Sequence, residues 1–251
     1  MIIPRYYEDL DFLHEHTMPP RAYYIPASHR MEDLVEHREA SDRVQMLNGM
    51  WKFRYFESIY DVRDAFYESG YDTSDFDEIP VPGVWQMAGY DTHQYTNFRY
   101  PFPFDPPYVP QDIPCGAYVH TFSSVKDEKA PKVYLNFEGV DSCFYVWVNG
   151  AYTGYSQVSH ATSEFDVTDV IEEGENTIAV LVLKWCDGSY LEDQDKFRMS
   201  GIFRDVYLLK RPEKAVQDYR ITTEITETCA KITLDINYYQ ETPVTVSVED
   251  A

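Results

Sequence analysis

Short stretches in which apolar and polar residues alternate dominate the chain. In the stretch 49–56, Trp51, Phe53 and Tyr55 alternate with lysine and arginine, which is the period of a half-buried strand. Further runs rich in valine, tyrosine, phenylalanine, threonine or leucine predict strands at 117–125, 132–137, 143–148, 151–155, 177–183 and 205–209. The dipeptide Asn149-Gly150 favours a type I′ hairpin turn between two of them. Short strands with frequent turns predict an all-β fold, a jelly-roll β-sandwich.

Helical patterns are confined to two short segments. Residues 31–38 predict one short helix, and residues 61–69 predict a second one. Asp61 is available as the N-cap of the second helix, and Gly70 is available as its stop. We therefore expect helices to contribute little to the core.

Changes in pattern divide the chain into three parts. Residues 1–45 are broken repeatedly by proline and predict an irregular N-terminal arm, whereas residues 46–213 hold the predicted jelly roll. Residues 214–251 alternate again and predict the first strands of an immunoglobulin-like domain, at 217–227, 230–238 and 242–249. A sandwich of that kind needs about seven strands. We therefore expect this second domain to be truncated and the parent protein to be longer.

Two long connections combine aromatic and polar side chains. Residues 79–114 contain eight prolines, which exclude a helix or a central strand, and many aromatic residues between them. Residues 184–205 place five carboxylates among aromatic and basic side chains: Asp187, Glu192, Asp193, Asp195 and Asp205. Buried carboxylates must be paired or hydrogen-bonded. We interpret both connections as ordered surfaces, and pairing with Lys196, Arg198 and Arg204 is the structural alternative to a binding role.

Charge and cysteine content narrow the classes of partner. The chain has 43 acidic and 21 basic side chains, a formal charge of −22, which disfavours nucleic acid and anionic membranes. No secretory leader is visible at the start, and no apolar run approaches the roughly 20 residues of a membrane helix. The four cysteines are scattered without metal-binding spacing. These features predict a cytoplasmic protein with reduced thiols.

Most catalytic signatures are missing from the sequence. Residues 193–198 begin like a calcium loop but lack the glycine and glutamate that such a loop needs at its sixth and twelfth positions. The HExxH, Gly-x-Ser-x-Gly and phosphate-binding glycine motifs do not occur. Two possibilities stay open from the residues alone. One is a cation held by carboxylates and carbonyls, and the other is a carbohydrate held by aromatic rings and polar side chains.

Several long motifs resemble a known family. They are PGVWQMAGYD at 82–91, YTNFRYP at 95–101, NFEGVDS at 136–142, WVNG at 147–150, SEFD at 163–166 and DGSYLEDQDKFRMSGIFRDV at 187–206. Together they resemble the sugar-binding domain of glycoside hydrolase family two, over about residues 47–212. The residues of these motifs are most similar to those of the long bacterial β-galactosidases. β-Glucuronidases share the domain.

The resemblance implies specific roles for a few residues. Asn97, the asparagine of YTN, is expected to contact galactosyl hydroxyls. Asp205, the aspartate of IFRD, is expected to contact sugar hydroxyls and to ligate a sodium ion. Trp85, Asp187 and Asp193 are expected to support the site.

The resemblance also implies how the parent enzyme works. It is expected to hydrolyse β-galactosides with retention, as a homo-oligomer that uses sodium and magnesium. The two catalytic glutamates and the magnesium site lie on a TIM barrel further along the parent. This chain alone is therefore expected to be inactive and to hold neither metal site complete.

Three alternatives remain open at this point. One is a stand-alone carbohydrate-binding module without catalysis, which needs a complete site within residues 1–251. The second is the equivalent domain of another enzyme of the family, such as a β-glucuronidase. The third is a domain whose main role is assembly of an oligomer.

Overall fold

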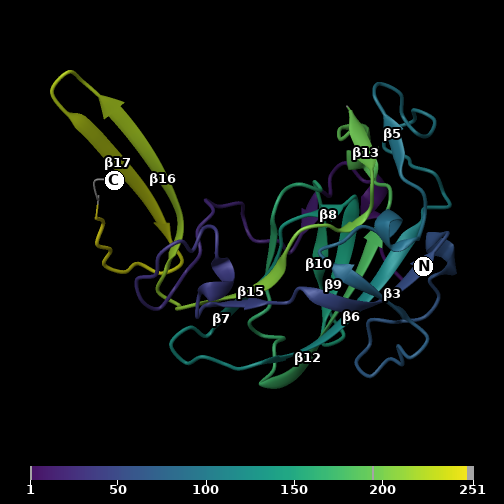
Figure 1. Cartoon of the computed structure of the whole chain (residues 1–251), viewed down its shortest axis with the longest axis horizontal. Coiled ribbons are helices and arrows are strands. Elements are labelled where there is room, and N and C mark those ends of the chain that lie inside the picture. Colours follow the sequence, from purple (N-terminus) through teal and green to yellow (C-terminus); the bar gives the residue numbers. More distant parts are fainter. Residues whose placement is uncertain (1, 194, 248–251) are drawn as a thin grey trace.

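The computed structural model describes residues 2–193 and 195–247 (Figure 1). Two antiparallel sheets form a sandwich, a seven-stranded sheet in the order β1-β10-β9-β12-β6-β3-β4 and a four-stranded sheet in the order β11-β7-β15-β2. In that order, the larger sheet consists of His14–Glu15, Ala151–Gln157, Cys143–Val148, Gly174–Leu183, Cys115–Ser124, Gly49–Phe56 and Asp77–Val81. The smaller sheet consists of Ser163–Asp166, Lys132–Phe137, Val206–Arg211 and Val44–Met46. The predicted all-β sandwich is confirmed.

Three two-stranded ribbons and five 3-10 turns complete the described part of the chain. The ribbons are β5 (Gln94–Thr96) with β13 (Lys196–Arg198), β8 (Val140–Asp141) with β14 (Gly201–Ile202), and β16 (Val216–Ile225) with β17 (Ala230–Tyr238). The turns are η1 (Tyr6–Glu8), η2 (Arg38–Ala40), η3 (Ile59–Asp61), η4 (Trp85–Ala88) and η5 (Asp187–Tyr190). The β16–β17 hairpin extends from one end of the molecule (Figure 1). That this hairpin begins an immunoglobulin-like domain stays a prediction.

The larger sheet is buried on both faces. In β9, Phe144, Val146 and Val148 pack between the sheets, whereas Tyr145 and Trp147 pack on the outer side. That outer cluster includes residues of the arm and of the long loops, Ile3, Tyr7, Ile59, Val62, Phe66, Phe76, Val109 and Ile113. Burial on both faces explains why β9 and β12 read as continuous apolar runs instead of alternating ones.

The outer face of the smaller sheet has a different character. Tyr134, Tyr207 and Leu209 lie on it with Met18 of the arm packed against them. Their sequence neighbours Leu135 and Leu208 point the other way, into the core between the sheets. The arm therefore covers part of both outer faces of the sandwich.

The strands and the hairpin turn predicted from local sequence patterns are mostly confirmed. The strands predicted at 49–56, 132–137, 143–148 and 230–238 have those bounds in the structure. Asn149 and Gly150 have φ of 50° and 79°, as a type I′ turn requires. The strand predicted at 242–249 is wrong over residues 242–247, which form none, and residues 248–249 lie outside the described residues.

Both predicted helices are wrong. Within 31–38, Asp33 has a φ of 58°, a left-handed conformation that a right-handed helix does not accept. Within 61–69, only Asp61 is helical, as the last residue of the 3-10 turn η3. The buried Val62 and Phe66 pack on the outer face of the larger sheet instead. Segments this short are marginal helices, so packing decides their conformation.

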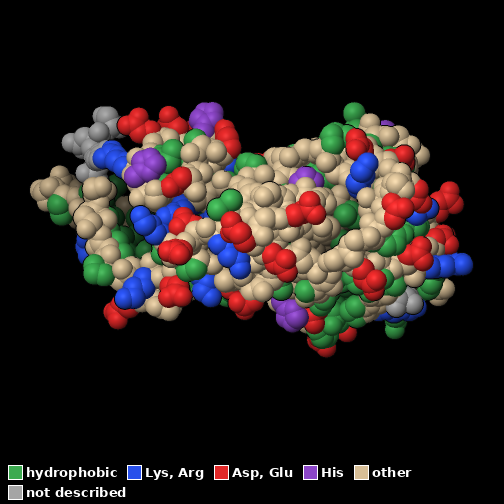
Figure 2. Space-filling model, turned by 90° about the horizontal axis from the view of Figure 1, so that it is seen from below, with side chains coloured by type: hydrophobic (Ala, Val, Ile, Leu, Met, Phe, Trp, Pro, Cys, Tyr) green, Lys and Arg blue, Asp and Glu red, His purple; other side chains and the backbone are tan. Residues whose placement is uncertain are grey.

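Acidic side chains are spread over the surface. Figure 2 shows them distributed across the visible face with lysines and arginines between them. On this face, basic side chains therefore lie among the acidic ones.

Candidate functional site

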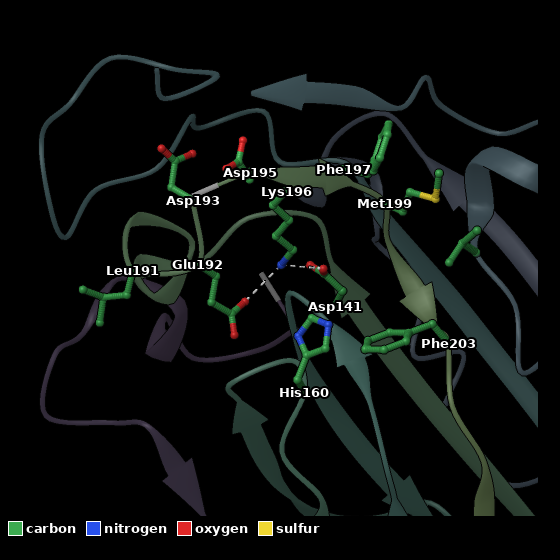
Figure 3. Close-up of a pocket in the computed structure, with 11 residues that line it drawn as sticks. Asp141, His160, Leu191, Glu192, Asp193, Asp195, Lys196, Phe197, Met199 and Phe203 are labelled. Carbon is green, nitrogen blue, oxygen red and sulfur yellow. Dashed lines mark hydrogen bonds and ion pairs between the residues drawn. The ribbon is translucent and has the colours of Figure 1, made fainter. Parts of the chain in front are cut away.

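A pocket of about 590 Å³ lies between the β5–β13 ribbon, the turn η5 and the β8–β14 ribbon (Figure 3). The connection 184–205 supplies most of its wall. The lining residues are Val84, Asp141, His160, Leu191, Glu192, Asp193, Asp195, Lys196, Phe197, Met199 and Phe203. A volume of this size suits a small-molecule ligand.

Lys196 organises the floor of this pocket. Its Nζ lies 2.8 Å from Asp141 Oδ2 and 3.3 Å from Glu192 Oε2, and Figure 3 shows it between the two carboxylates. Glu192 also accepts hydrogen bonds from Ser159, at 2.9 Å from the backbone N–H and 2.7 Å from the hydroxyl. Burial raises the pKa of Asp141, and Lys196 opposes that rise. The carboxylates of the floor are thus held in an ion-pair network.

Asp193, which lines the pocket, belongs to a second ion pair. Arg198 binds its carboxylate through Nη2, and the guanidinium lies 5.8 Å from the centre of the Trp185 ring. Lys196 and Arg198 therefore pair with carboxylates, as the structural alternative predicts. Arg204 does not: it donates to the His160 carbonyl at 3.2 Å, and no ion pair involves it among the residues described.

Asn97 lies at the end of β5, outside the pocket wall. Its carbonyl accepts the Asp195 N–H at 3.3 Å, which extends the pairing of β5 with β13 by one residue. Tyr95 on β5 donates its hydroxyl to Asp195 Oδ1 at 2.7 Å. The Asn97 side chain is exposed, and within the described chain no hydrogen bond engages its amide. The amide is therefore available to a ligand.

Asp205 lies immediately before β15 and is held by two side chains. Asn48 donates Nδ2 to Asp205 Oδ1 at 2.8 Å and accepts the Val206 N–H on its own Oδ1 at 3.0 Å. Arg38 Nε lies 3.7 Å from Asp205 Oδ2, and its guanidinium also binds Glu138. The Asp205 side chain keeps 31% of its surface exposed. One carboxylate oxygen is therefore fixed, and the other has capacity for a further partner.

The two expected sugar-binding residues lie on separate elements. Asn97 is next to the β5–β13 ribbon, and Asp205 is at the start of β15 in the smaller sheet. Neither lines the pocket, and no hydrogen bond or ion pair found among the described residues joins them. The ribbon and Phe203, two residues before Asp205, both contribute to the pocket wall.

Trp85 and Asp187 are both buried. Trp85 is fully buried and donates its indole N–H to the Tyr118 hydroxyl, while its backbone N–H binds the Ser200 carbonyl at 2.9 Å. It therefore supports the segment before β14 and does not reach a ligand. Burial raises the pKa of Asp187, although hydrogen bonds from Gln157 and from the Gly188 N–H lower it. Neither residue lines the pocket.

Asp205 is a suitable donor for sodium but does not form a cage for it. A carboxylate oxygen is the kind of ligand that a hard cation prefers. Within 2–193 and 195–247, no three His, Cys, Asp or Glu side chains are grouped closely enough to hold a metal ion. Arg38 also places positive charge near Oδ2.

The sequence analysis did not identify Asn48, Arg38, Asp141 or His160. Asn48 and Asp205 are separated by 157 positions, so no local spacing indicates their hydrogen bond. Asp141 was part of a recognised motif, but only the fold places it beside Lys196.

Among the residues described, no helix is both long and apolar enough to cross a membrane.

Comparison with known proteins gives consistent matches. A family model described as glycosyl hydrolases family 2, sugar binding domain, matches residues 44–212. The β-galactosidase of Actinobacillus pleuropneumoniae is 52% identical over 90% of this chain, which corresponds to 22% of that protein. The β-galactosidase of Staphylococcus xylosus is 45% identical over 94% of the chain and 23% of that protein. The chain thus spans about a fifth of the length of these relatives.

Solved structures show the same fold at lower identity. A β-glucuronidase from an uncultured Clostridium sp. has a TM-score of 0.59 and 22% identity, over 78% of this chain and 33% of that one. A Ruminococcus gnavus β-glucuronidase in complex with D-glucaro-δ-lactam has a TM-score of 0.63 and 17% identity, over 88% of this chain and 36% of that one. Sequence identity this low supports a shared fold and nothing further.

Proposed function

This chain belongs to glycosyl hydrolase family 2, and on that premise we propose that it is the N-terminal, sugar-binding part of a retaining β-galactosidase. The observation that supports this most directly is the 52% identity to the Actinobacillus pleuropneumoniae β-galactosidase over 90% of the chain. The proposed substrate is a terminal β-D-galactoside, such as lactose, and the whole protein carries the activity.

In this proposal, two residues of the chain contact the galactosyl group. Asn97 presents an amide that both donates and accepts, so it can read the orientation of a hydroxyl. Asp205 accepts hydrogen bonds from sugar hydroxyls through the carboxylate oxygen that Asn48 leaves free. Trp85, Asp187 and Asp193 support the surrounding structure from buried positions.

Two metal ions belong to the proposed enzyme. Asp205 would supply one carboxylate ligand to sodium, which provides positive charge near the sugar hydroxyls when it is bound. Magnesium and the two catalytic glutamates are assigned to another domain of the whole protein. This chain would therefore bind and orient the galactosyl group without hydrolysing anything alone.

Further proposals concern the state of the protein in the cell. The described cysteines are free thiols, of which Cys115, Cys143 and Cys186 are buried, and reduced thiols are typical of a cytoplasmic protein. We also propose a homo-oligomeric parent with residues 214–251 as the start of a second, immunoglobulin-like domain.

A chimera tests the proposal. In it, this chain replaces the matching segment of the Actinobacillus pleuropneumoniae β-galactosidase, and hydrolysis of o-nitrophenyl β-galactoside and p-nitrophenyl β-glucuronide is compared. The proposal predicts that the chimera hydrolyses the galactoside and leaves the glucuronide intact. A folded chimera that prefers the glucuronide, or that cleaves neither substrate, contradicts it. The isolated chain serves as the control and is expected to cleave neither.

A further inference from the structure

A second pocket lies on the outer face of the smaller sheet, beneath the N-terminal arm. Its volume is about 220 Å³. The arm supplies one wall and strands β7, β11 and β15 supply the floor. The lining residues are His14, Met18, Pro19, Pro20, Arg21, Tyr23, Asn136, Ala161, Thr162, Glu164 and Tyr207. None of them is among the residues proposed above for galactoside binding.

Three polar side chains form the floor because of strand register. Asn136 on β7 is directly opposite Glu164 on β11 and Tyr207 on β15. Residues opposite one another in antiparallel strands point to the same face. All three are buried, and Asn136 is not exposed at all. A row of buried polar side chains on a sheet face is unusual unless each of them has a partner.

Asn136 lacks one of its partners. Its Nδ2 donates to the Tyr134 carbonyl at 3.2 Å, whereas its Oδ1 has no hydrogen-bond donor in the described chain. A buried acceptor without a donor destabilises the folded protein, so such groups normally have an explanation. Nδ2 is held by a main-chain carbonyl of its own strand, so Oδ1 is the atom of this buried amide that is left for a ligand.

The charges around the pocket balance one another. Arg21 binds Glu164 through two hydrogen bonds, Nε to Oε1 at 3.1 Å and Nη2 to Oε2 at 2.7 Å. Burial lowers the pKa of His14, which keeps its ring neutral at pH 7. The pocket therefore has no unpaired charge to attract an ion. It does have acceptor oxygens on Asn136 and Glu164 and a hydroxyl on Thr162.

The apolar part of the wall suits the face of a sugar ring. Tyr23, Tyr207, Met18 and the two prolines of the arm line the pocket around the polar floor. The pocket volume equals that of about seven waters of ~30 Å³ each. This volume suits one pyranose ring and is too small for an oligosaccharide. Aromatic faces with a few fixed polar groups are the usual environment of a bound sugar.

We propose that this pocket binds one small neutral polyhydroxylated molecule of the monosaccharide class, with a hydroxyl donating to Asn136 Oδ1. The pocket is lined by neither Asn97 nor Asp205, and Arg38, which pairs with Asp205, lies over the rings of Tyr23 and Tyr207 in its wall. It lies under the arm, so an occupant would also join the arm to the smaller sheet.

Titration of the 251-residue chain tests this proposal. D-Galactose, myo-inositol and D-glucuronate are titrated separately by isothermal calorimetry and by saturation-transfer NMR. The expected result is saturable millimolar binding of the two neutral polyols, at least about tenfold weaker in Asn136→Leu and unchanged in Asn237→Leu, an exposed control on β17. Loss of binding in Asp205→Asn with retention in Asn136→Leu would instead place the sugar at the galactoside contacts and overturn the proposal.

Two further variants keep the test decisive if Asn136→Leu does not fold. Tyr23→Ala changes an arm residue that is 44% exposed, so it is expected to fold and to weaken binding severalfold. Tyr60→Ala, at a comparably exposed tyrosine outside the pocket, is the matched control and is expected to bind normally. Absence of saturable binding in the folded wild-type chain, tighter binding of glucuronate, or equal effects of the two tyrosine variants would refute the proposal.

Discussion

The Asn48 side chain makes hydrogen bonds to both residues of the Asp205–Val206 peptide. It donates to the Asp205 carboxylate at 2.8 Å and accepts the N–H of the next residue, Val206, at 3.0 Å. The carboxylate that the proposed function places against the sugar is thus fixed at one oxygen by the segment between β2 and β3. Its orientation depends on a residue that has no expected contact with substrate.

Replacing Asn48 tests this positioning role. In the chimera with the Actinobacillus pleuropneumoniae enzyme, Asn48→Leu is expected to raise the KM for o-nitrophenyl β-galactoside about fivefold to thirtyfold, because the loss of one charge-assisted hydrogen bond is worth about 1–2 kcal/mol. The sodium concentration for half-maximal activity is expected to rise as well. Asn237→Leu on β17 is the matched control. An Asn48 variant that only lowers stability, with both constants unchanged, would show a purely structural role.

Lys196 is expected to be essential for the stability of the pocket floor. Lys196→Met leaves Asp141 and Glu192 without their shared cation, and unpairing largely buried carboxylates costs about 3 kcal/mol. Urea denaturation measures the free energy of unfolding. Lys231→Met is the control, because Lys231 forms an exposed pair with Glu224 that contributes at most about 1 kcal/mol. Equal losses in the two variants would contradict the network described for Lys196.

The buried Asp187 predicts a pH dependence. Burial raises its pKa in the folded state above the ordinary value of 3.8, so the folded protein holds this proton more tightly than the unfolded chain. Its stabilising contribution is therefore present below that value and is lost as the pH rises through the folded pKa. Asp187→Asn keeps an acceptor for the Gly188 N–H and removes the ionisation. The stability of the wild type relative to this variant is expected to fall between pH 4 and pH 7, and a rise would contradict the assigned cause.

Local pattern was sufficient to predict most of the sandwich. Strands such as β7 and β9 have the predicted bounds because a run rich in valine and aromatic residues can be recognised within a single segment. The short β5 and β13 were not predicted, because three residues carry too little pattern and each strand exists only through pairing with the other. The predicted helices failed because tertiary packing of Val62 and Phe66 overrode a weak local preference.

The candidate site was predicted only in part for a related reason. The acidic character of residues 184–205 is visible in the sequence, and the structure shows that this connection lines most of the pocket. Which carboxylates are paired depends on contacts between distant segments, such as Lys196 with Asp141 and Asn48 with Asp205. The residue pattern therefore indicated this connection without separating paired carboxylates from an available one. Only the family resemblance singled out Asp205, and its role stays a prediction.

The most direct measurement is the activity of the Asp205→Asn variant of the chimera across a sodium titration. Asparagine keeps the size of the side chain and removes the charge that the proposed sugar and sodium contacts need. The account predicts that kcat/KM for o-nitrophenyl β-galactoside falls at least about 100-fold, or ~2.7 kcal/mol, and no longer responds to sodium. A folded variant with near wild-type kcat/KM and an unchanged sodium response would contradict the central claim that Asp205 belongs to the galactoside site.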